Sequence, residues 1–316
     1  MNNKVFVTSR SFSENDFLRK KLLSKYPRSK FNETGKRLKT SELISLAQYS
    51  DKLIIALDKI DIKTLSYLPN LKVISKYGVG LDNINLKDLE KLKIRLGWKR
   101  GQNSRAVSEL VMGYILAISR DLFNYQNSMK KLSLFKQFPS NELTHKKIGI
   151  VGCGSIGSDL IKLLSPYKCQ IFVNDIRKIN LRGNLQKQCS LNTLLEKSDI
   201  ISIHTPLTSK TFNLINKDNF QLCKKNLLII NCARGGIINE SDLNNFLKKN
   251  KNSAAALDVF EKEPALKHKL FKNKNFYCSP HVGGSTYQSI INMGLSAIEG
   301  LDEHINIKKL YKYGYE

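Results

Sequence analysis

The hydrophobic pattern of the chain is a succession of short apolar runs separated by amphipathic or polar stretches. In the first part of the chain the apolar runs fall at 4–8, 52–57, 72–75 and 93–96, with helical patterns at 14–24, 41–48, 61–68 and 86–92. Runs this short, rich in Val, Ile and Leu, are typical of buried strands. Strands that alternate with helices predict a parallel sheet covered on both faces.

A second series of apolar runs follows, at 148–151, 171–173, 199–203, 227–230, 254–257 and 276–278. Each run ends in a polar residue, such as His204, Asn231 or Asp258. In an open parallel sheet the carboxyl ends of the strands form the ligand crevice. We therefore expect these polar residues, and the residues just after them, to converge on one edge of a second sheet.

One long helix is predicted between the two series. Apolar residues recur at helical spacing from Val107 to Ile118, and Asn103 or Ser104 can serve as the N-cap. A helix this apolar is expected to cross between domains or to pack against another subunit. The segment 124–147 is rich in Lys, and we expect it to be irregular surface.

The second series opens with a glycine pattern that predicts a phosphate-binding turn. The run at 147–151 leads into Gly152, Gly154 and Gly157, after which apolar positions at helical spacing continue to Pro166. The next strand ends at Asp175, which would hold the adenosine ribose hydroxyls and repel a 2′-phosphate. An ordinary glycine turn is the plainer interpretation. The order strand, turn, helix, strand, Asp favours a Rossmann dinucleotide site with NAD as cofactor.

The charge of the chain suggests an anionic partner, but its distribution does not. The formal net charge is +25, from 52 Lys and Arg against 27 Asp and Glu. These cations are scattered from Lys4 to Lys312 and are not interleaved with stacking aromatics. Solvated surface lysines explain this pattern better than a nucleic-acid groove. We expect neither nucleic acid nor a membrane as partner.

The cysteines and the N-terminus indicate a cytoplasmic protein. The six cysteines form no C-x-x-C pair and show no metal-ligand spacing, so we expect reduced, mostly buried thiols and no metal site. The chain enters its first strand directly after Met1, without the pattern of a signal peptide. No apolar run approaches the length of about 18 residues needed to span a membrane.

Three side chains at the predicted sheet edge suggest hydride-transfer chemistry. Taken singly, Arg234 before Gly-Gly, Glu263 before Pro and His281 each have a plainer structural interpretation. Together they supply what a 2-hydroxy or 2-keto acid requires. Arg234 offers a bidentate cation for the carboxylate, and His281 an imidazole that exchanges a proton with the substrate oxygen. Glu263 offers a carboxylate that orients the imidazole.

These motifs resemble the D-isomer-specific 2-hydroxyacid dehydrogenase family. The residues that carry the resemblance are Gly-x-Gly-x-x-Gly at 152–157, His-Thr-Pro-Leu-Thr at 204–208, Asn-x-x-Arg-Gly at 231–235, Asp-Val-Phe-x-x-Glu-Pro at 258–264, Pro-His-Val-Gly-Gly-Ser-Thr at 280–286, Asn-Ser-Arg-Ala-Val-Ser-Glu-Leu-Val at 103–111 and Gly-Val-Gly-Leu-Asp-Asn at 78–83. The similarity covers nearly the whole chain. The Gly-Gly-Ser-Thr after the histidine is most similar to phosphoglycerate dehydrogenases.

The resemblance implies an α/β fold of two doubly wound parallel-sheet domains. A Rossmann-type dinucleotide-binding domain at 101–284 would be inserted in a discontinuous, flavodoxin-like substrate domain at 1–100 and 285–316. Catalysis would lie in the cleft between them. A homodimer built around the helix from Asn103 is also implied.

The resemblance further implies the roles of individual residues. Arg234 would anchor the substrate carboxylate, His281 would be the acid and base, and Glu263 would be its partner. Arg234 and His281 would contact the substrate together with the loop Tyr77, Gly78, Val79 and Gly80. The expected cofactor-binding residues are Gly152, Gly154, Ser155, Ile156, Gly157, Asp175, His204, Pro206, Cys232, Ala233, Asp258 and Gly283, with Asp258 near the nicotinamide ring.

Two questions stay open at this point. Phosphoglycerate dehydrogenases tend to carry an Arg-Ser pair where this chain has Ala56 and Leu57, although Lys59, Lys76 or Arg105 could compensate. The identity of the small 2-hydroxy acid, and whether it is phosphorylated, is therefore open. The family also includes dinucleotide-binding co-repressors, so an interaction protein with little catalysis is the alternative function.

Overall fold

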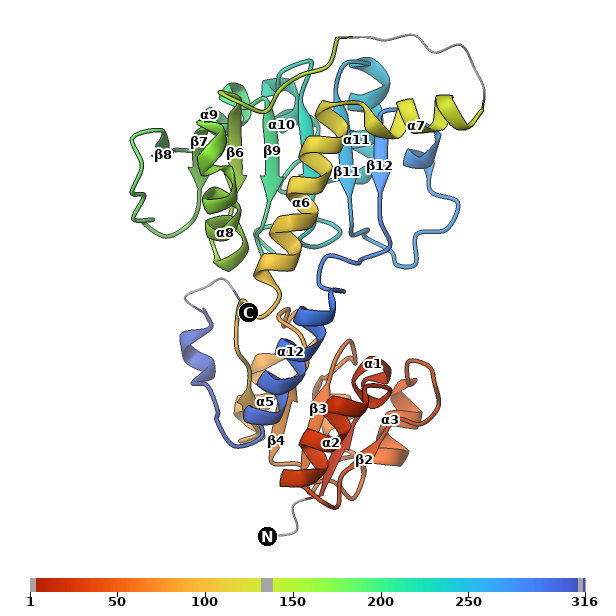
Figure 1. The fold of residues 1–316 in the computed structure, drawn as a ribbon. Coiled ribbons are helices and arrows are strands. Elements are labelled where there is room, and N and C mark those ends of the chain that lie inside the picture. Colours follow the sequence, from red (N-terminus) through yellow and green to blue (C-terminus); the bar gives the residue numbers. More distant parts are fainter. Residues whose placement is uncertain (1–3, 132–138, 312–314, 316) are drawn as a thin grey trace. The chain divides into compact units, whose positions relative to one another are not determined.

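The computed structural model describes residues 4–131, 139–311 and 315. Two compact units make up the chain (Figure 1). The N-terminal unit consists of 1–103 and 285–316, and the central unit consists of 104–284. Each unit is a parallel sheet with helices on both faces, which is the two-sheet α/β fold expected from the alternation of strands and helices.

The sheet of the N-terminal unit has five parallel strands in the order β2-β1-β3-β4-β5. This is the flavodoxin-like order predicted from the resemblance. Side chains of successive residues alternate between the two faces: Leu53 and Ile55 pack in one core cluster, and Ile54 packs in the other. The strands are β1 Val5–Val7, β2 Lys30–Phe31, β3 Lys52–Ile55, β4 Val73–Lys76 and β5 Arg95–Gly97.

Helices from both ends of the chain cover this sheet. Gly294 of α12 lies against α2, where a Cβ would come within 2.4 Å of the Leu18 side chain, so the two helices pack closely at that point. The described helices are α1 Arg10–Ser13, α2 Asp16–Lys25, α3 Thr40–Ala47, α4 Ile62–Leu65, α5 Leu86–Lys91, α12 Tyr287–Glu299 and the 3-10 helix η3 Ile307–Lys309.

The sheet of the central unit has seven parallel strands in the order β12-β11-β10-β9-β6-β7-β8. The order reverses between β6 and β9, which gives the Rossmann arrangement with its crevice at that switch point. The strands are β6 Lys147–Val151, β7 Gln170–Asn174, β8 Gln186–Gln188, β9 Ile200–Ile203, β10 Leu228–Asn231, β11 Ala254–Leu257 and β12 Phe276–Cys278.

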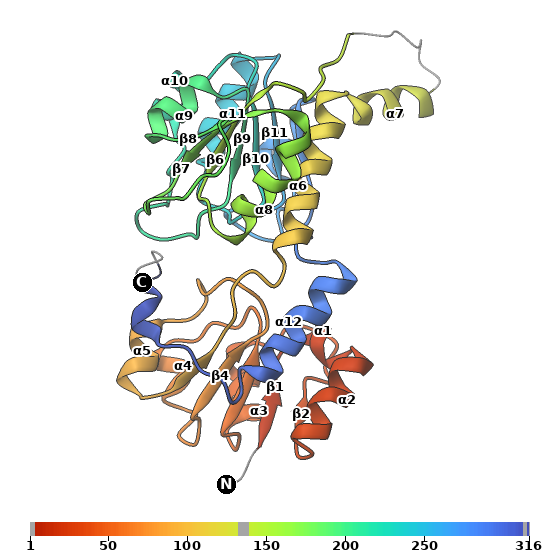
Figure 2. The same cartoon turned by 60° about the vertical axis from the view of Figure 1, so that its left-hand side comes forward.

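Two groups of helices cover the faces of this sheet (Figure 2). Helices α6 and α8 pack on one face, while α9, α10 and α11 pack on the other. Helix α7 continues from α6, and two 3-10 helices complete the set. The bounds are α6 Ser104–Ser119, α7 Leu122–Lys130, α8 Ser155–Leu164, α9 Leu191–Lys197, α10 Lys217–Leu222, α11 Glu240–Lys249, η1 Ser165–Tyr167 and η2 Lys269–Lys272.

The structure corrects several expectations. Part of the segment 124–147 is helical, because α7 starts after Asp121, whose left-handed backbone (φ 54°) turns the chain out of α6. The helix expected at 14–24 is α2, which starts only at Asp16 because Asn15 caps it, and the short helix α1 precedes it. The edge strands β2 and β8 were not expected, since neither has an apolar run. The expectation of mostly buried thiols holds, since four of the six cysteines are buried and Cys278 is exposed. Residues 132–138 lie outside the described part.

Candidate active site

The turn after β6 is tight enough to require glycine. Gly152 has φ 89°, and a Cβ there would lie 2.8 Å from the Thr205 side chain and 2.9 Å from the His204 carbonyl oxygen. A Cβ on Gly157 would lie 2.4 Å from the Gly152 oxygen. Gly154 caps α8 without a side-chain hydrogen bond, and α8 starts at Ser155 directly after the turn, where the helix dipole favours an anion.

The tip of β9, beside this turn, holds buried polar atoms without a protein partner. Among the described residues, Oγ1 of Thr205 and Nδ1 of His204 make no hydrogen bond. Nε2 of His204 lies 2.8 Å from the Ser202 hydroxyl. Burial lowers the pKa of His204 to about 3, so the imidazole is neutral. Unpaired buried polar atoms are costly, and hydroxyl or amide groups of a dinucleotide would satisfy them. The residues present therefore fit NAD.

Asp175, at the end of β7, is held by the glycine turn and by a neighbouring arginine. One oxygen accepts from the Cys153 amide at 2.8 Å, and the guanidinium of Arg177 pairs with both oxygens at 2.9 and 3.0 Å. Burial would raise the pKa of the Asp175 carboxyl, but the hydrogen bonds from Arg177 and Cys153 lower it below its usual value. Asp175 is therefore ionised at neutral pH.

The turn after β10 is organised by a buried asparagine. Oδ1 of Asn231 accepts from the Ala233 amide at 3.0 Å, and its Nδ2 donates to the Arg234 carbonyl at 2.8 Å. A Cβ on Gly235 would lie 2.0 Å from the Phe260 backbone, so this turn packs directly against the segment that leads to Glu263. Arg234 donates to the Ala233 carbonyl at 2.7 Å.

His281 and Glu263 come together at the ends of β12 and β11. Nδ1 of His281 lies 2.8 Å from Oε2 of Glu263, and Oε1 of Glu263 accepts from the Phe260 amide at 3.1 Å. The two side chains are 39% and 37% exposed, so a substrate can reach them. An imidazole oriented by a carboxylate has the chemistry that general acid–base catalysis requires.

Asp258 holds the loop that carries His281. Asp258 is 1% exposed, and its side chain accepts from the Val282 and Gly283 amides, each at 2.8 Å, and from the Ser279 hydroxyl. Its carbonyl accepts from the His281 amide at 2.8 Å. These contacts use both carboxylate oxygens within the loop. Cys232, the first residue after β10, is also buried, and burial raises the pKa of its thiol, which stays protonated.

Residues 77–80 follow β4 in the N-terminal unit. The Tyr77 side chain is buried and its hydroxyl accepts from Ser11 at 3.4 Å, so the backbone of the loop, not this ring, is available to a ligand. Burial also raises the pKa of Tyr77. Gly78 has φ 129°, which a side chain rarely tolerates, and Val79 and Gly80 complete the loop.

Other residues of the site were missed by the sequence analysis. Ser279 and Tyr114 join the hydrogen bonds around Asp258. Pro206, which the sequence does predict at the cofactor site, starts a loop in which its carbonyl accepts from the Thr211 hydroxyl at 2.6 Å. The position of Ser279 two residues before His281 was the one available signal. Within the described residues there is no His, Cys, Asp or Glu cluster that could hold a metal, and no helix there has the length and apolar character to cross a bilayer.

A Rossmann sheet with this turn and an ionised carboxylate after its second strand defines a dinucleotide-binding protein of the dehydrogenase class. Residues 112–283 match the family model of the D-isomer specific 2-hydroxyacid dehydrogenase NAD-binding domain. The chain is 36% identical over 270 residues to glyoxylate reductase of Thermofilum pendens, covering 82% of this chain and 80% of that one. The chain therefore belongs to the D-isomer specific 2-hydroxyacid dehydrogenase family and is NAD-dependent.

Further relatives carry different substrate names. Hydroxypyruvate reductase of Thermotoga maritima is 31% identical over 87% of this chain and 91% of its own length. D-3-phosphoglycerate dehydrogenase of Methanocaldococcus jannaschii is 33% identical, but the match spans 81% of this chain and only 50% of that protein. The NAD⁺-bound 3-phosphoglycerate dehydrogenase of Entamoeba histolytica matches in structure with a TM-score of 0.79 at 25% identity, over 100% of this chain and 97% of that one. Phosphoglycerate dehydrogenases are thus one of several similar groups.

Proposed function

We propose that this protein reduces a small, unphosphorylated 2-keto acid of the glyoxylate or hydroxypyruvate type to the D-2-hydroxy acid. The observation that carries the proposal is the contact of 2.8 Å between Nδ1 of His281 and Oε2 of Glu263, beside the turn of Arg234. Hydride transfer to a keto acid needs a proton donor and a carboxylate anchor, and this edge of the sheet offers both.

Each group then has one task in the reaction. The central unit would hold NADH, which when bound would supply a hydride for C2 of the keto acid. Arg234 holds the substrate carboxylate through paired N–H donors and fixes its orientation. Protonated His281 stabilises the negative charge that develops on the keto oxygen and gives that oxygen its proton. Glu263 stabilises the imidazolium, and oxidation runs through the same step in reverse with neutral His281 as base.

Three cations that could bind a substrate phosphate already have partners. Lys59 pairs with Asp61 at 3.2 Å, and Arg105 pairs with Asp159 at 2.9 Å. Lys76 is 4% exposed and donates to Oδ1 of Asn83 at 2.6 Å.

The loop after β3 presents an apolar side chain. Leu57 is 60% exposed there, next to Ala56, and neither residue can bind a phosphate. Together with the reductase names among the relatives, this supports an unphosphorylated substrate.

We propose a separate binding role for each of the two units. The central unit would bind NAD through the turn at 152–157, Asp175 and the strand-end residues His204, Pro206, Cys232, Ala233, Asp258 and Gly283. The N-terminal unit would bind substrate through the backbone at 77–80. The six free thiols favour a reducing, cytoplasmic location.

A substrate panel tests the proposed function. Glyoxylate, hydroxypyruvate, pyruvate and phosphorylated hydroxypyruvate are assayed side by side for loss of reduced-nicotinamide absorbance. We expect turnover of the small unphosphorylated acids and a kcat/KM for the phosphorylated acid that is at least about 10-fold lower, since one unmet charged contact costs that much or more. His281→Asn should lower kcat by about 10²–10⁴. Preference for the phosphorylated acid would contradict the substrate assignment.

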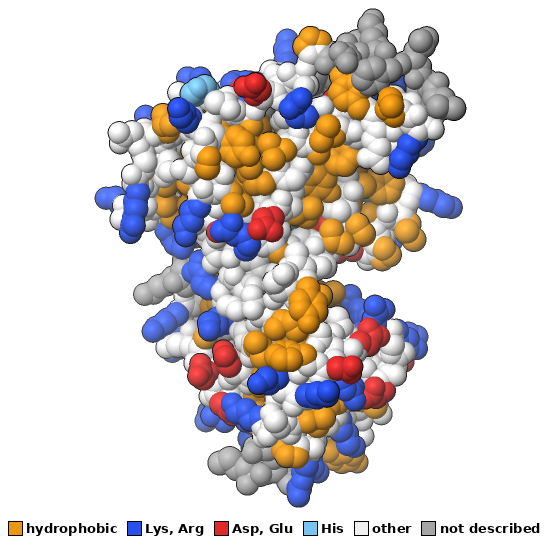
Figure 3. Space-filling view, viewed as in Figure 1, with side chains coloured by type: hydrophobic (Ala, Val, Ile, Leu, Met, Phe, Trp, Pro, Cys, Tyr) orange, Lys and Arg blue, Asp and Glu red, His pale blue; other side chains and the backbone are white. Residues whose placement is uncertain are grey.

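We also propose a homodimer built on α6 and α7. Hydrophobic side chains gather on the face that carries α6 (Figure 3), and Leu116, Leu122, Phe123 and Met129 of these helices are 36%, 54%, 37% and 59% exposed. Exposed apolar groups of this size on adjoining helices favour burial against a second copy. Sedimentation should give twice the chain mass, and Leu122→Glu with Phe123→Glu should give a monomer.

A further inference from the structure

The loop that carries His281 has an unusual backbone conformation. His281 has φ 56°, in the left-handed region that non-glycine residues rarely adopt. Such conformations persist when the surrounding structure holds them, and they cluster at functional sites. Asp258 holds this one through its carbonyl and both carboxylate oxygens, which accept from the amides of residues 281–283.

A second set of contacts holds Asp258 in turn. The hydroxyl of Ser279 donates to Oδ1 of Asp258, and the hydroxyl of Tyr114 donates to Oγ of Ser279 at 2.7 Å. The direction of these bonds is fixed, because an ionised carboxylate only accepts and the one hydrogen of Ser279 points to it. Oγ of Ser279 can then only accept the hydrogen bond that the hydroxyl of Tyr114 donates.

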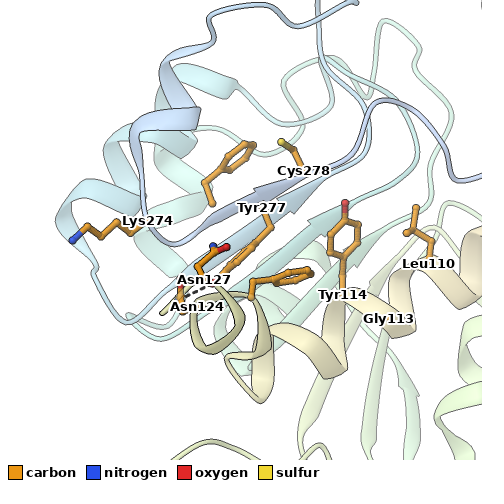
Figure 4. A pocket seen from close by; sticks show the side chains of 10 residues that line it. Leu110, Gly113, Tyr114, Asn124, Asn127, Lys274, Tyr277 and Cys278 are labelled. Atoms are coloured by element: carbon orange, nitrogen blue, oxygen red, sulfur yellow. Dashed lines mark hydrogen bonds between the residues drawn. The ribbon is translucent and has the colours of Figure 1, made fainter. Parts of the chain in front are cut away.

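Tyr114 comes from a different element than the loop. It lies on α6, and its ring lines an open cleft of about 600 Å³ together with Tyr277 of β12 (Figure 4). Burial raises the pKa of Tyr114 to about 12, so its hydroxyl keeps its proton across the working pH range. Its role can therefore only be to donate a hydrogen bond, not to exchange a proton with the substrate.

We propose that Ser279 and Tyr114 are positioning residues that keep the loop of His281 in its reactive conformation by fixing the carboxylate of Asp258. The proposal rests on the proposed function, because it assigns His281 as the acid. Without the hydroxyl of Ser279, Oδ1 of Asp258 loses a charge-assisted donor in a buried site. The carboxylate can then rotate away from the amides of Val282 and Gly283, and His281 is no longer fixed beside Glu263.

The test compares four variants. Ser279→Ala removes the donor to Asp258, Ser279→Thr keeps a hydroxyl, and Tyr114→Phe removes only the outer donor. Tyr277→Phe is the matched control, because its hydroxyl lies in the same cleft and its contact is with Asn124 at 3.3 Å, not with Ser279. Figure 4 draws this contact as a dashed line.

We expect Ser279→Ala to lower kcat by about 10- to 100-fold, because a small misplacement of a catalytic group such as His281 has an effect of this size. Tyr114→Phe should lower kcat by a smaller factor, and Ser279→Thr and Tyr277→Phe should stay within about twofold of wild type. The Kd for NADH and the Tm of each variant should change little. Of the four variants, only Ser279→Ala should move the alkaline limb of kcat/KM for reduction to lower pH. In that variant the His281 imidazolium is no longer held beside the carboxylate of Glu263.

A measurement without substrate separates this proposal from the proposed function. Hydrogen–deuterium exchange of the peptide that contains residues 281–283 reports the amides bound by Asp258. We expect faster exchange in Ser279→Ala and wild-type exchange in Tyr277→Phe. If no keto acid is turned over but exchange changes as expected, the proposed function fails while the positioning of the loop stands. Wild-type exchange and wild-type kcat in Ser279→Ala would overturn the positioning proposal.

Discussion

Nδ1 of His281 lies 2.8 Å from Oε2 of Glu263, and the second oxygen of the same carboxylate is held by the Phe260 amide at 3.1 Å. The carboxylate therefore cannot turn freely, and its outer oxygen is aimed at the imidazole. This leaves Nε2 of His281 as the nitrogen that can reach a substrate oxygen. The pair is partly exposed, so its effect on activity comes from orientation and charge together.

The first prediction concerns Glu263. Glu263→Gln keeps a hydrogen-bond acceptor for His281 but removes the negative charge that favours the imidazolium. The alkaline limb of kcat/KM for keto-acid reduction should move to lower pH, and activity at high pH should fall by about 10-fold. A pH–rate profile measures this. The acid limb serves as the internal control, and a profile that superimposes on that of wild type would remove Glu263 from the proton step.

The second prediction concerns the carboxylate anchor. Arg234→Lys keeps the positive charge but loses the planar fork that binds a carboxylate through two N–H groups. KM for every accepted keto acid should rise by about 10- to 100-fold, the value of a charged hydrogen bond. The Kd for NADH, measured by fluorescence, should stay the same. If KM is unaltered and NADH binding weakens, Arg234 serves the cofactor and not the substrate.

The third prediction concerns cofactor preference. Asp175 uses both oxygens to hold the guanidinium of Arg177. Asp175→Ala removes the charge that repels a 2′-phosphate and releases Arg177 to bind it. The ratio of kcat/KM for NADPH to that for NADH should rise by at least about 10-fold, since ion pairing with phosphate is charge-assisted. Asp175→Ala combined with Arg177→Ala should abolish the gain. Equal ratios in wild type and Asp175→Ala would show that another group sets the preference.

Much of the fold follows from local sequence patterns. The runs that became β6, β9 and β10 are apolar because both faces of the central sheet are covered, so the sequence marks them clearly. The glycines at 152 and 157 are readable because no other residue fits the close backbone contacts there. The edge strand β8, Gln-Lys-Gln, has no apolar residue and depends on pairing with β7 alone, so no local pattern marks it.

The site was predictable only in part, because some of its contacts join residues that are far apart in the chain. Arg234, Glu263 and His281 stand at strand ends, where parallel topology gathers them, and their residue types suggest chemistry. The contact of Tyr114 with Ser279 joins residues far apart in the chain, and in the sequence Tyr114 fits the apolar stripe of its helix. Its hydroxyl acquires a role only when the packing of α6 against the sheet is known.

The last prediction concerns the pH dependence of stability in the N-terminal unit. Asp302, just after α12, accepts from Lys25 at 2.6 Å, from Lys52 at 2.9 Å and from the hydroxyl of Tyr26. Burial would raise the pKa of the Asp302 carboxyl, but the hydrogen bonds from these three residues lower it well below its usual value. A lowered pKa means that the ionised form stabilises the fold above the ordinary carboxyl pKa of about 4, and that this contribution is lost as pH falls further.

Asp302→Asn mimics the protonated acid, so it should lower the free energy of unfolding by about 1 kcal/mol at neutral pH. Charged hydrogen bonds contribute more than this in buried sites, but the Asp302 side chain is 42% exposed, so solvent screens their contribution to the free energy of unfolding. The difference from wild type should shrink near pH 3. Thermal unfolding of both proteins at the two pH values measures it, with Glu303→Gln as the control that removes the same charge from the neighbouring residue. An equal difference at both pH values would mean that the contacts of Asp302 stabilise the unit without a contribution from its charge.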